Sequence, residues 1–258
     1  MDLRKSKYIL PNLFTLSSVF FGLLSVIWAM EGTAESFRRA ALAIVMAAIA
    51  DGLDGRVARM TRTETKFGVQ LDSLADVLSF GMAPAVLAYA FALRQVDADG
   101  SHVGLILAFL YVACGAMRLA RFNVQAERTR GPSNFFTGLP IPGAAGIVAT
   151  LVWCFVDLDV QEPMRTLLTG IAMLSVGMLM VSTVRYRNFK HVHLTTPIKV
   201  LIVVAASLVG VAVVVTQASA VLLCLGSAYV VMGPAEWFVT LAWRVRPGRR
   251  PRSHTREP

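Results

Sequence analysis

Apolar residues run along this chain in long stretches, separated by short polar or charged segments. A helix needs about 20 mostly apolar residues to cross the hydrocarbon core of a bilayer. By this criterion the sequence predicts eight membrane-spanning helices, at about 9–30, 37–58, 69–93, 103–122, 138–157, 164–184, 197–217 and 219–243. The predicted fold is therefore all-α, a polytopic membrane helix bundle.

The composition favours the same class of protein. Hydrophobic residues make up 55% of the chain and charged residues only 16%, whereas a soluble domain carries about 25% charged residues. So few charges could not cover a soluble domain of 258 residues, and the composition also excludes a disordered chain and a disulfide scaffold. We expect one membrane domain over residues 1–243 and a basic, disordered cytoplasmic tail over 244–258.

The basic residues indicate an orientation. If the N-terminus is cytoplasmic and the spans alternate, the cytoplasmic side holds every Lys and Arg except Arg38, Arg39, Arg94 and Arg165. Cytoplasmic loops are typically enriched in these residues. The pattern predicts an integral protein of the cytoplasmic (inner) membrane with both termini cytoplasmic. The net charge of +9 is then explained by loops that face anionic membrane lipids, and we expect no nucleic-acid partner.

Two predicted spans carry aspartates near their cytoplasmic ends. Asp51 and Asp54 are three residues apart and share one helix face, and Asp72 and Asp76, four residues apart, share a face of the next helix. The short linker between these helices makes them antiparallel neighbours. Four carboxylates are therefore expected to converge at the cytoplasmic edge of the bilayer.

Ionisable groups at this depth are costly and usually functional. Four carboxylates would need cations to stay ionised, and their oxygens suit Mg²⁺, Mn²⁺ or Ca²⁺. Two such ions could grip a diphosphate, as in phosphoryl-transfer enzymes. Gly55 and Gly68 would let a ligand approach the backbone, and Arg59 could meet a phosphate. Small residues in membrane helices often only pack, but packing does not require four aspartates.

The acidic stretch matches a long sequence signature at every position, spacing included. The matching residues are Asp51, Asp54, Gly55, Ala58, Arg59, Gly68, Asp72 and Asp76. Over residues 51–76 the chain thus resembles the CDP-alcohol phosphotransferase family. Three further segments, 8–15, 118–123 and 136–142, are similar to those of bacterial-type phosphatidylserine synthases in that family.

This resemblance implies the CDP-alcohol phosphotransferase fold and a reaction. The phosphatidyl group of CDP-diacylglycerol would pass to L-serine, giving phosphatidylserine and CMP. It implies two divalent cations, Mg²⁺ or Mn²⁺, held by Asp51, Asp54, Asp72 and Asp76, with Asp76 also acting as general base. A homodimer is expected as well, with its active site on the cytoplasmic side.

The resemblance also carries over binding positions. Those for CDP-diacylglycerol are Asn12, Thr15, Gly55, Arg59, Thr65 and Gly68. Serine brings a carboxylate, for which Arg118 and Arg121 are the candidate cations, with Asn123 as a hydrogen-bonding neighbour. Both arginines have an equally good alternative role as anchors that reach lipid phosphates.

Three other functions stay open at this point. A related enzyme would use glycerol 3-phosphate, inositol phosphate or an amino alcohol as acceptor, and the aspartate signature does not separate these. A cation transporter would also use aspartates within the membrane, although here all four lie at one edge of the bilayer. A lipid-binding protein without chemistry would leave the full signature unexplained.

Overall fold

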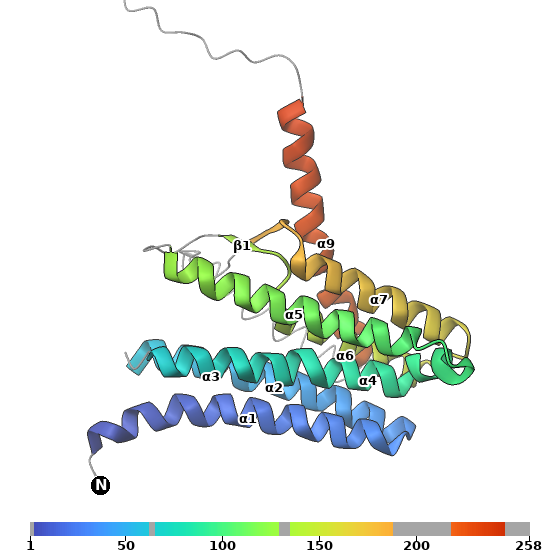
Figure 1. Cartoon of the computed structure of the whole chain (residues 1–258), viewed down its shortest axis with the longest axis horizontal. Helices are drawn as coiled ribbons and strands as arrows, with labels where there is room; N and C mark the ends of the chain where they lie inside the picture. The colour runs from blue at the N-terminus through green and yellow to red at the C-terminus, as the bar shows by residue number, and fades with distance from the viewer. Residues whose placement is uncertain (1–2, 62–64, 129–134, 188–217, 246–258) are drawn as a thin grey trace, which may run out of the picture.

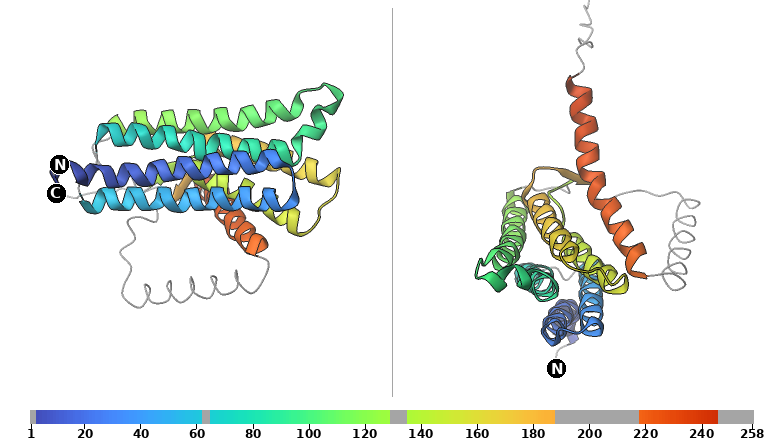
Figure 2. Two further views of the ribbon diagram at one scale, coloured as in Figure 1. Left: turned by 90° about the horizontal axis from the view of Figure 1, so that it is seen from below. Right: turned by 90° about the vertical axis from the view of Figure 1, so that its right-hand side faces the viewer.

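The computed structural model describes residues 3–61, 65–128, 135–187 and 218–245. Long helices lie side by side in a bundle, and the C-terminal helix α9 projects away from it (Figure 1). An end-on view shows α1 and α2 at one side of the bundle and α9 leaving from the opposite side (Figure 2).

The elements follow the chain in this order: α1 (Leu3–Glu31), α2 (Ala34–Thr61), α3 (Lys66–Asp76), the π-helix η1 (Val77–Met82), α4 (Ala83–Phe91), the 3₁₀-helix η2 (Leu93–Asp99), α5 (Val103–Arg128), β1 (Phe135–Thr137), α6 (Ile141–Asp157), α7 (Met164–Val181), β2 (Arg185–Arg187) and α9 (Ala218–Val245). Every predicted span except one coincides with helix. The exception, 197–217, lies outside the described residues.

Four helical segments in the described part of the chain are long and apolar enough to cross a membrane. They are Asn12–Glu31, Phe67–Phe91, Val103–Gln125 and Met164–Val181. The apolar helix α6 is shorter, and α2 carries charged residues at both ends. A membrane helix bundle is thus supported, while the count of eight spans stays a prediction.

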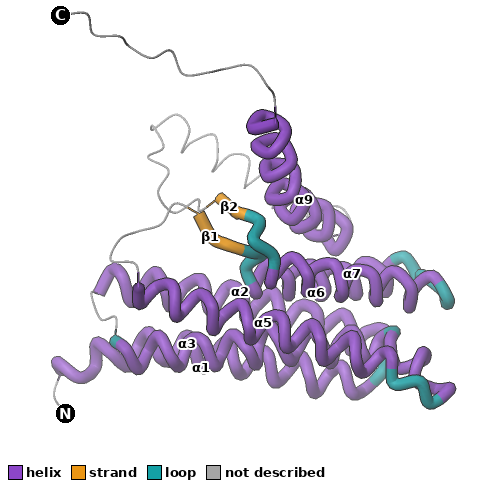
Figure 3. Tube along the Cα trace, turned by 45° about the horizontal axis from the view of Figure 1, so that its top comes forward, coloured by secondary structure: helices purple, strands orange, loops and turns teal. Residues whose placement is uncertain are grey.

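The all-α prediction missed a small antiparallel sheet. β1 and β2 pair with Phe135 opposite Arg187 and Thr137 opposite Arg185. Figure 3 shows both strands on the side of the bundle from which α9 projects. Each strand has only three residues, which is too short for an alternating pattern to be read in the sequence.

Small residues bring the helices into close contact at the core. On α2, Ala40, Ile44 and Ala47 lie on one face and are fully buried. Such residues let membrane helices approach closely. Large apolar side chains on outer faces stay exposed, among them Phe20, Phe109 and Met178, as expected for surfaces that face lipid.

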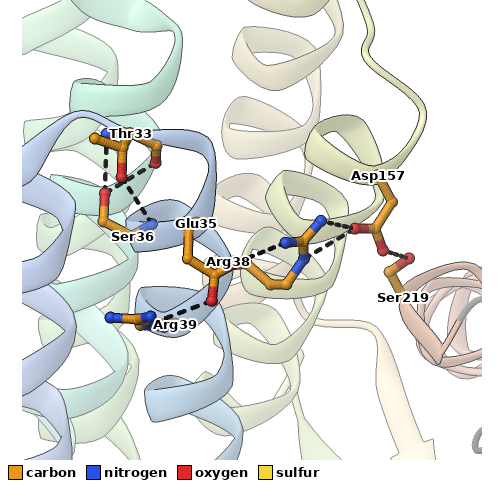
Figure 4. Close-up of polar contacts among 7 residues, drawn as sticks. All are labelled: Thr33, Glu35, Ser36, Arg38, Arg39, Asp157 and Ser219. Carbon is orange, nitrogen blue, oxygen red and sulfur yellow. Dashed lines mark hydrogen bonds and ion pairs between the residues drawn. The ribbon is translucent and has the colours of Figure 1, made fainter.

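A polar network joins three helices at the bundle end away from the aspartates (Figure 4). Arg38 on α2 donates to Oδ1 of Asp157 on α6 at 3.1 and 2.7 Å. Ser219 on α9 donates to the other carboxylate oxygen of Asp157 at 2.6 Å. Hydrogen bonds from Arg38 and Arg39 hold the pKa of Glu35 below its ordinary value. This network fixes the start of α9 against α2 and α6.

Candidate active site

Helices α2 and α3 bring three aspartates together. One carboxylate oxygen from each of Asp51, Asp72 and Asp76 lies within 4.8 Å of the other two. Asp76 is buried, with 9% of its surface exposed, and the other two are half-buried. The predicted convergence of carboxylates from the two helices is confirmed for these three residues, which we call the aspartate triad.

Asp54 lies beside the triad but is held by a different contact. Its side chain is buried, and Oδ2 accepts a hydrogen bond of 2.7 Å from Oγ1 of Thr15 on α1. Thr15 therefore orients an acidic residue of the signature. The direct contact with CDP-diacylglycerol that the sequence predicts for Thr15 stays a prediction.

The triad has the chemistry of a divalent cation site. When ionised, three carboxylates whose oxygens lie within 4.8 Å of one another repel, and a cation between them relieves this repulsion. Oδ1 of Asp76 is buried and has no hydrogen-bond partner among the described residues. Oxygen donors of this kind are those that Mg²⁺ and Mn²⁺ prefer. The residues present thus fit a divalent metal.

Three of the predicted CDP-binding positions gather at the start of α3. Thr65 is the N-cap of this helix, and its Oγ1 accepts a hydrogen bond of 2.9 Å from the Gly68 amide. A Cβ added at Gly68 would lie 3.2 Å from Thr65 Oγ1 and 3.8 Å from Asn12 Oδ1. The surroundings of Gly55 and Arg59 lie outside the described residues.

Arg118 on α5 lies within electrostatic range of Asp76 in the triad. Its side chain is buried, with 7% of its surface exposed, and its guanidinium interacts electrostatically with Asp76. Its Nε has no hydrogen-bond partner among the described residues. Tyr229, half-buried on α9, also lies within electrostatic range of the Arg118 guanidinium. The guanidinium carbon of Arg118 lies 6.0 Å from the centroid of the Phe122 ring.

Arg121 has other partners. Its guanidinium donates to the backbone carbonyl of Val181 at 2.8 Å and to those of Thr137, Met180 and Ser182 at 3.2 Å each. Arginine side chains often bind the last carbonyls of a helix in this way. Arg121 therefore caps the C-terminal end of α7, and these contacts do not support its predicted role in serine binding.

Gly138 completes the structure around Arg121. Its φ of +81° is in the left-handed region. A Cβ there would collide with the Met180 carbonyl oxygen and lie 2.8 Å from Arg121 Nη2. Pro140 follows as the N-cap of α6. The 118–123 and 136–142 segments, which lie apart in sequence, thus meet at this point.

Asn123 contacts the helix that carries two of the triad residues. Its Nδ2 donates a hydrogen bond of 2.9 Å to Oγ of Ser73, which in turn donates to the Val69 carbonyl at 3.0 Å. Ser73 directly follows Asp72 in the chain. Asn123 therefore ties α5 to α3 next to the aspartates.

Ser73 and Tyr229 were not identified from the sequence. Ser73 stands within the aspartate signature, so its position between two acidic residues was an available signal. Tyr229 follows the triad by more than half the chain, and no local pattern connects it with Arg118.

The chain is similar in sequence to known proteins over most of its length. Residues 8–184 match the model of the CDP-alcohol phosphatidyltransferase family. The CDP-diacylglycerol–serine O-phosphatidyltransferase of Helicobacter pylori strain 26695 is 41% identical over 207 residues, which cover 78% of this chain and 81% of the relative. The archaetidylserine synthase of Methanothermobacter thermautotrophicus is 36% identical over 181 residues, 69% of each chain. A CDP-diacylglycerol–serine O-phosphatidyltransferase of Methanocaldococcus jannaschii is 34% identical over 211 residues, covering 82% of this chain and 86% of the relative. The chain belongs to the CDP-alcohol phosphatidyltransferase family.

Proposed function

We propose that this protein transfers the phosphatidyl group of CDP-diacylglycerol to the hydroxyl group of L-serine, with phosphatidylserine and CMP as products. Two of the relatives described above carry the name of this activity. The structural observation that carries the proposal is the aspartate triad with the buried cation of Arg118 beside it. The acidic triad suits the divalent metal that would bind a diphosphate, and the Arg118 cation suits the carboxylate of an amino acid.

Asp51, Asp72 and Asp76, together with Asp54, would hold two divalent cations, Mg²⁺ or Mn²⁺. Bound there, the cations would neutralise the charge of the diphosphate and of the departing CMP. Thr15 supports this arrangement, because its hydrogen bond fixes the Asp54 carboxylate.

Asp76 is the residue that would move the proton. Its Oδ1 is buried and lacks a protein partner in the described part of the chain, so this oxygen can accept the proton of the serine hydroxyl. The serine oxygen bonds to the phosphorus of the phosphatidyl group. The bond between this phosphorus and the CMP oxygen breaks, and CMP leaves with the electron pair.

Arg118 would bind the serine carboxylate. Arg118 suits this role better than Arg121, because the Arg121 guanidinium is engaged by four backbone carbonyls. A charge-assisted hydrogen bond from a buried arginine is strong and directional. Asn123 would contribute indirectly, through its hydrogen bond to Ser73 on α3.

The CDP moiety would lie at the start of α3. Asn12, Thr65 and Gly68 approach one another there, which supports the set predicted from the sequence, with Thr15, Gly55 and Arg59 as its other members. Gly68 leaves the backbone open to the ligand.

The setting of the enzyme is part of the proposal. The basic loops support an inner-membrane protein with cytoplasmic termini and a cytoplasmic active site, among anionic membrane lipids. We also propose a homodimer and a single catalytic domain over 1–243, followed by a basic tail over 244–258.

Release of CMP from CDP-diacylglycerol tests the proposal. Purified protein is incubated with a divalent metal and with one acceptor at a time. L-serine should support CMP release, while glycerol 3-phosphate, inositol phosphate and ethanolamine should not. Release with one of these instead of serine would identify a different enzyme of the family. No release with any acceptor, together with metal flux in proteoliposomes, would indicate a transporter.

A further inference from the structure

The helix that carries Asp72 and Asp76 widens immediately after Asp76. Residues Val77–Met82 form the π-helix η1, in which the Ala83 amide bonds to the Leu78 carbonyl, five residues back. A π-helical turn contains one more residue than an α-helical turn. The extra residue rotates α3 by about 100° relative to α4. The direction in which Asp76 points therefore depends on this turn.

Pro84 gives a physical reason for the wide turn. In an α-helix the amide of residue 84 would bond to the carbonyl of Phe80, but proline has no N–H, and its ring clashes with the carbonyl four residues back. Widening the turn moves the Phe80 carbonyl away from the Pro84 ring. This carbonyl then needs a donor from elsewhere.

Tyr111 on α5 supplies that donor. Its hydroxyl donates a hydrogen bond of 3.0 Å to the Phe80 carbonyl, and both residues are almost completely buried. On the other side, α1 packs directly against the turn, since a Cβ at Gly22 would lie 2.9 Å from Ser79 Cα. The wide turn is thus held between α1 and α5.

We propose that Tyr111 is a positioning residue for the reaction. By binding the Phe80 carbonyl it holds the π-helical turn, and the turn sets the rotation that places Asp76 next to Asp51 and Asp72. Without the hydroxyl, the Phe80 carbonyl has no donor, because Pro84 cannot supply one, and the turn can shift and rotate Asp76 away from the triad. The catalytic meaning of this inference rests on the proposed function, whereas its effect on the triad can be measured by metal binding alone.

The experiment uses the full-length protein in detergent and compares Tyr111→Phe with Tyr89→Phe. Tyr89 lies on α4 at the other end of the same span, so the control removes the same chemical group away from the turn. Three quantities are measured: Tm, the Kd for Mn²⁺ from the paramagnetic resonance of free Mn²⁺, and kcat for serine-dependent CMP release. Tyr111→Phe should weaken Mn²⁺ binding and lower kcat about tenfold each, the equivalent of one hydrogen bond. Tyr89→Phe should leave the Kd for Mn²⁺ and kcat near their wild-type values.

A second substitution separates positioning from stability. Pro84→Ala provides an amide that can bond the Phe80 carbonyl in an α-helical turn. Added to Tyr111→Phe, it should restore Tm while Mn²⁺ affinity and kcat stay low or fall further. If the double variant regains all three, or if Tyr111→Phe matches Tyr89→Phe, the positioning role is refuted.

Should Tyr111→Phe fail to fold, Pro84→Ala tests the premise of the proposal, that the π-helical turn positions the triad. Weaker Mn²⁺ binding at unchanged or higher Tm supports the proposal, and wild-type Mn²⁺ binding overturns it. If the wild type binds Mn²⁺ but releases no CMP with serine, the proposed function fails separately. The Mn²⁺ comparison then still decides whether Tyr111 positions the triad.

Discussion

Thr15 and Asp54 join the first two helices through one buried hydrogen bond. Oγ1 of Thr15 donates to Oδ2 of Asp54 at 2.7 Å, and each residue exposes only 5% of its surface. A charged acceptor in such surroundings depends strongly on its donors. The contact explains how a residue on α1, far from the aspartates in sequence, belongs to the same site.

Replacing Thr15 with Val should impair the enzyme without unfolding it. The substitution keeps the shape and removes the donor to the Asp54 carboxylate. Loss of a hydrogen bond to a charged group costs about 1.5–3 kcal/mol, which corresponds to roughly 10- to 150-fold in kcat/KM for CDP-diacylglycerol. Thr15→Ser keeps a hydroxyl and should recover most of the activity. Equal activity in the Val and Ser variants would show that the hydrogen bond does not matter for catalysis.

Arg118 and Arg121 should respond differently to truncation. Arg118→Ala should raise the serine KM by roughly 10- to 150-fold and change the CDP-diacylglycerol KM far less, because only serine brings a carboxylate to this cation. Arg118→Lys keeps the charge but not the planar fork, so its serine KM should lie between those of the wild type and Arg118→Ala.

Arg121→Ala is the matched comparison. It removes a cap from the end of α7 and should lower Tm while leaving the ratio of the two KM values near wild type. The assignment would be reversed if Arg121→Ala raised the serine KM selectively and Arg118→Ala did not.

Removal of divalent metal should stop turnover. Three carboxylate oxygens within 4.8 Å of one another repel unless a cation is present, and a diphosphate adds further negative charge. Exhaustive EDTA treatment should abolish CMP release, and added Mg²⁺ or Mn²⁺ should restore it. Full turnover by protein shown to be free of metal would exclude the proposed role of the triad.

Asp157 should matter for stability and not for chemistry. Asp157→Ala removes the bonds to Arg38 and Ser219 that join α2, α6 and α9. We expect a loss of about 1–2 kcal/mol of unfolding free energy, kept small because Arg38 is over a third exposed and water screens its charge. The control Asp99→Ala changes an exposed residue of η2 and should have no effect. A selective rise in the serine KM of Asp157→Ala would contradict a purely structural role.

The sequence predicted the features that depend on local spacing. Apolar length located the helices, and the i, i+3 and i, i+4 spacing of the aspartates placed them on two helix faces that do meet. Pairing between short strands is not local, so β1 and β2 were missed. The hydrogen bonds of Arg121 at the end of α7 could not be predicted either, because the carbonyls that accept them are some 60 residues away.

The π-helical turn after Asp76 depends both on a local residue and on a distant one. The sequence predicts one continuous span over 69–93, and nothing was inferred from Pro84, although a proline interrupts the helical hydrogen-bond pattern. The sequence could not show that the helix would continue through a π-helical turn, because this outcome depends on Tyr111 of another helix. A local signal was thus present at this position, but its consequence depends on a distant residue.

The most direct test of the central claim follows the oxygen atom of serine. L-serine labelled with ¹⁸O in its hydroxyl group is incubated with CDP-diacylglycerol, metal and either the wild type or Asp76→Asn. If the serine hydroxyl attacks the phosphatidyl phosphorus, mass spectrometry should find the label in phosphatidylserine, in the oxygen that bridges phosphorus and serine. CMP should be unlabelled, and Asp76→Asn should form neither product. Phosphatidylserine without the label, or a near-normal rate in Asp76→Asn, would contradict the account.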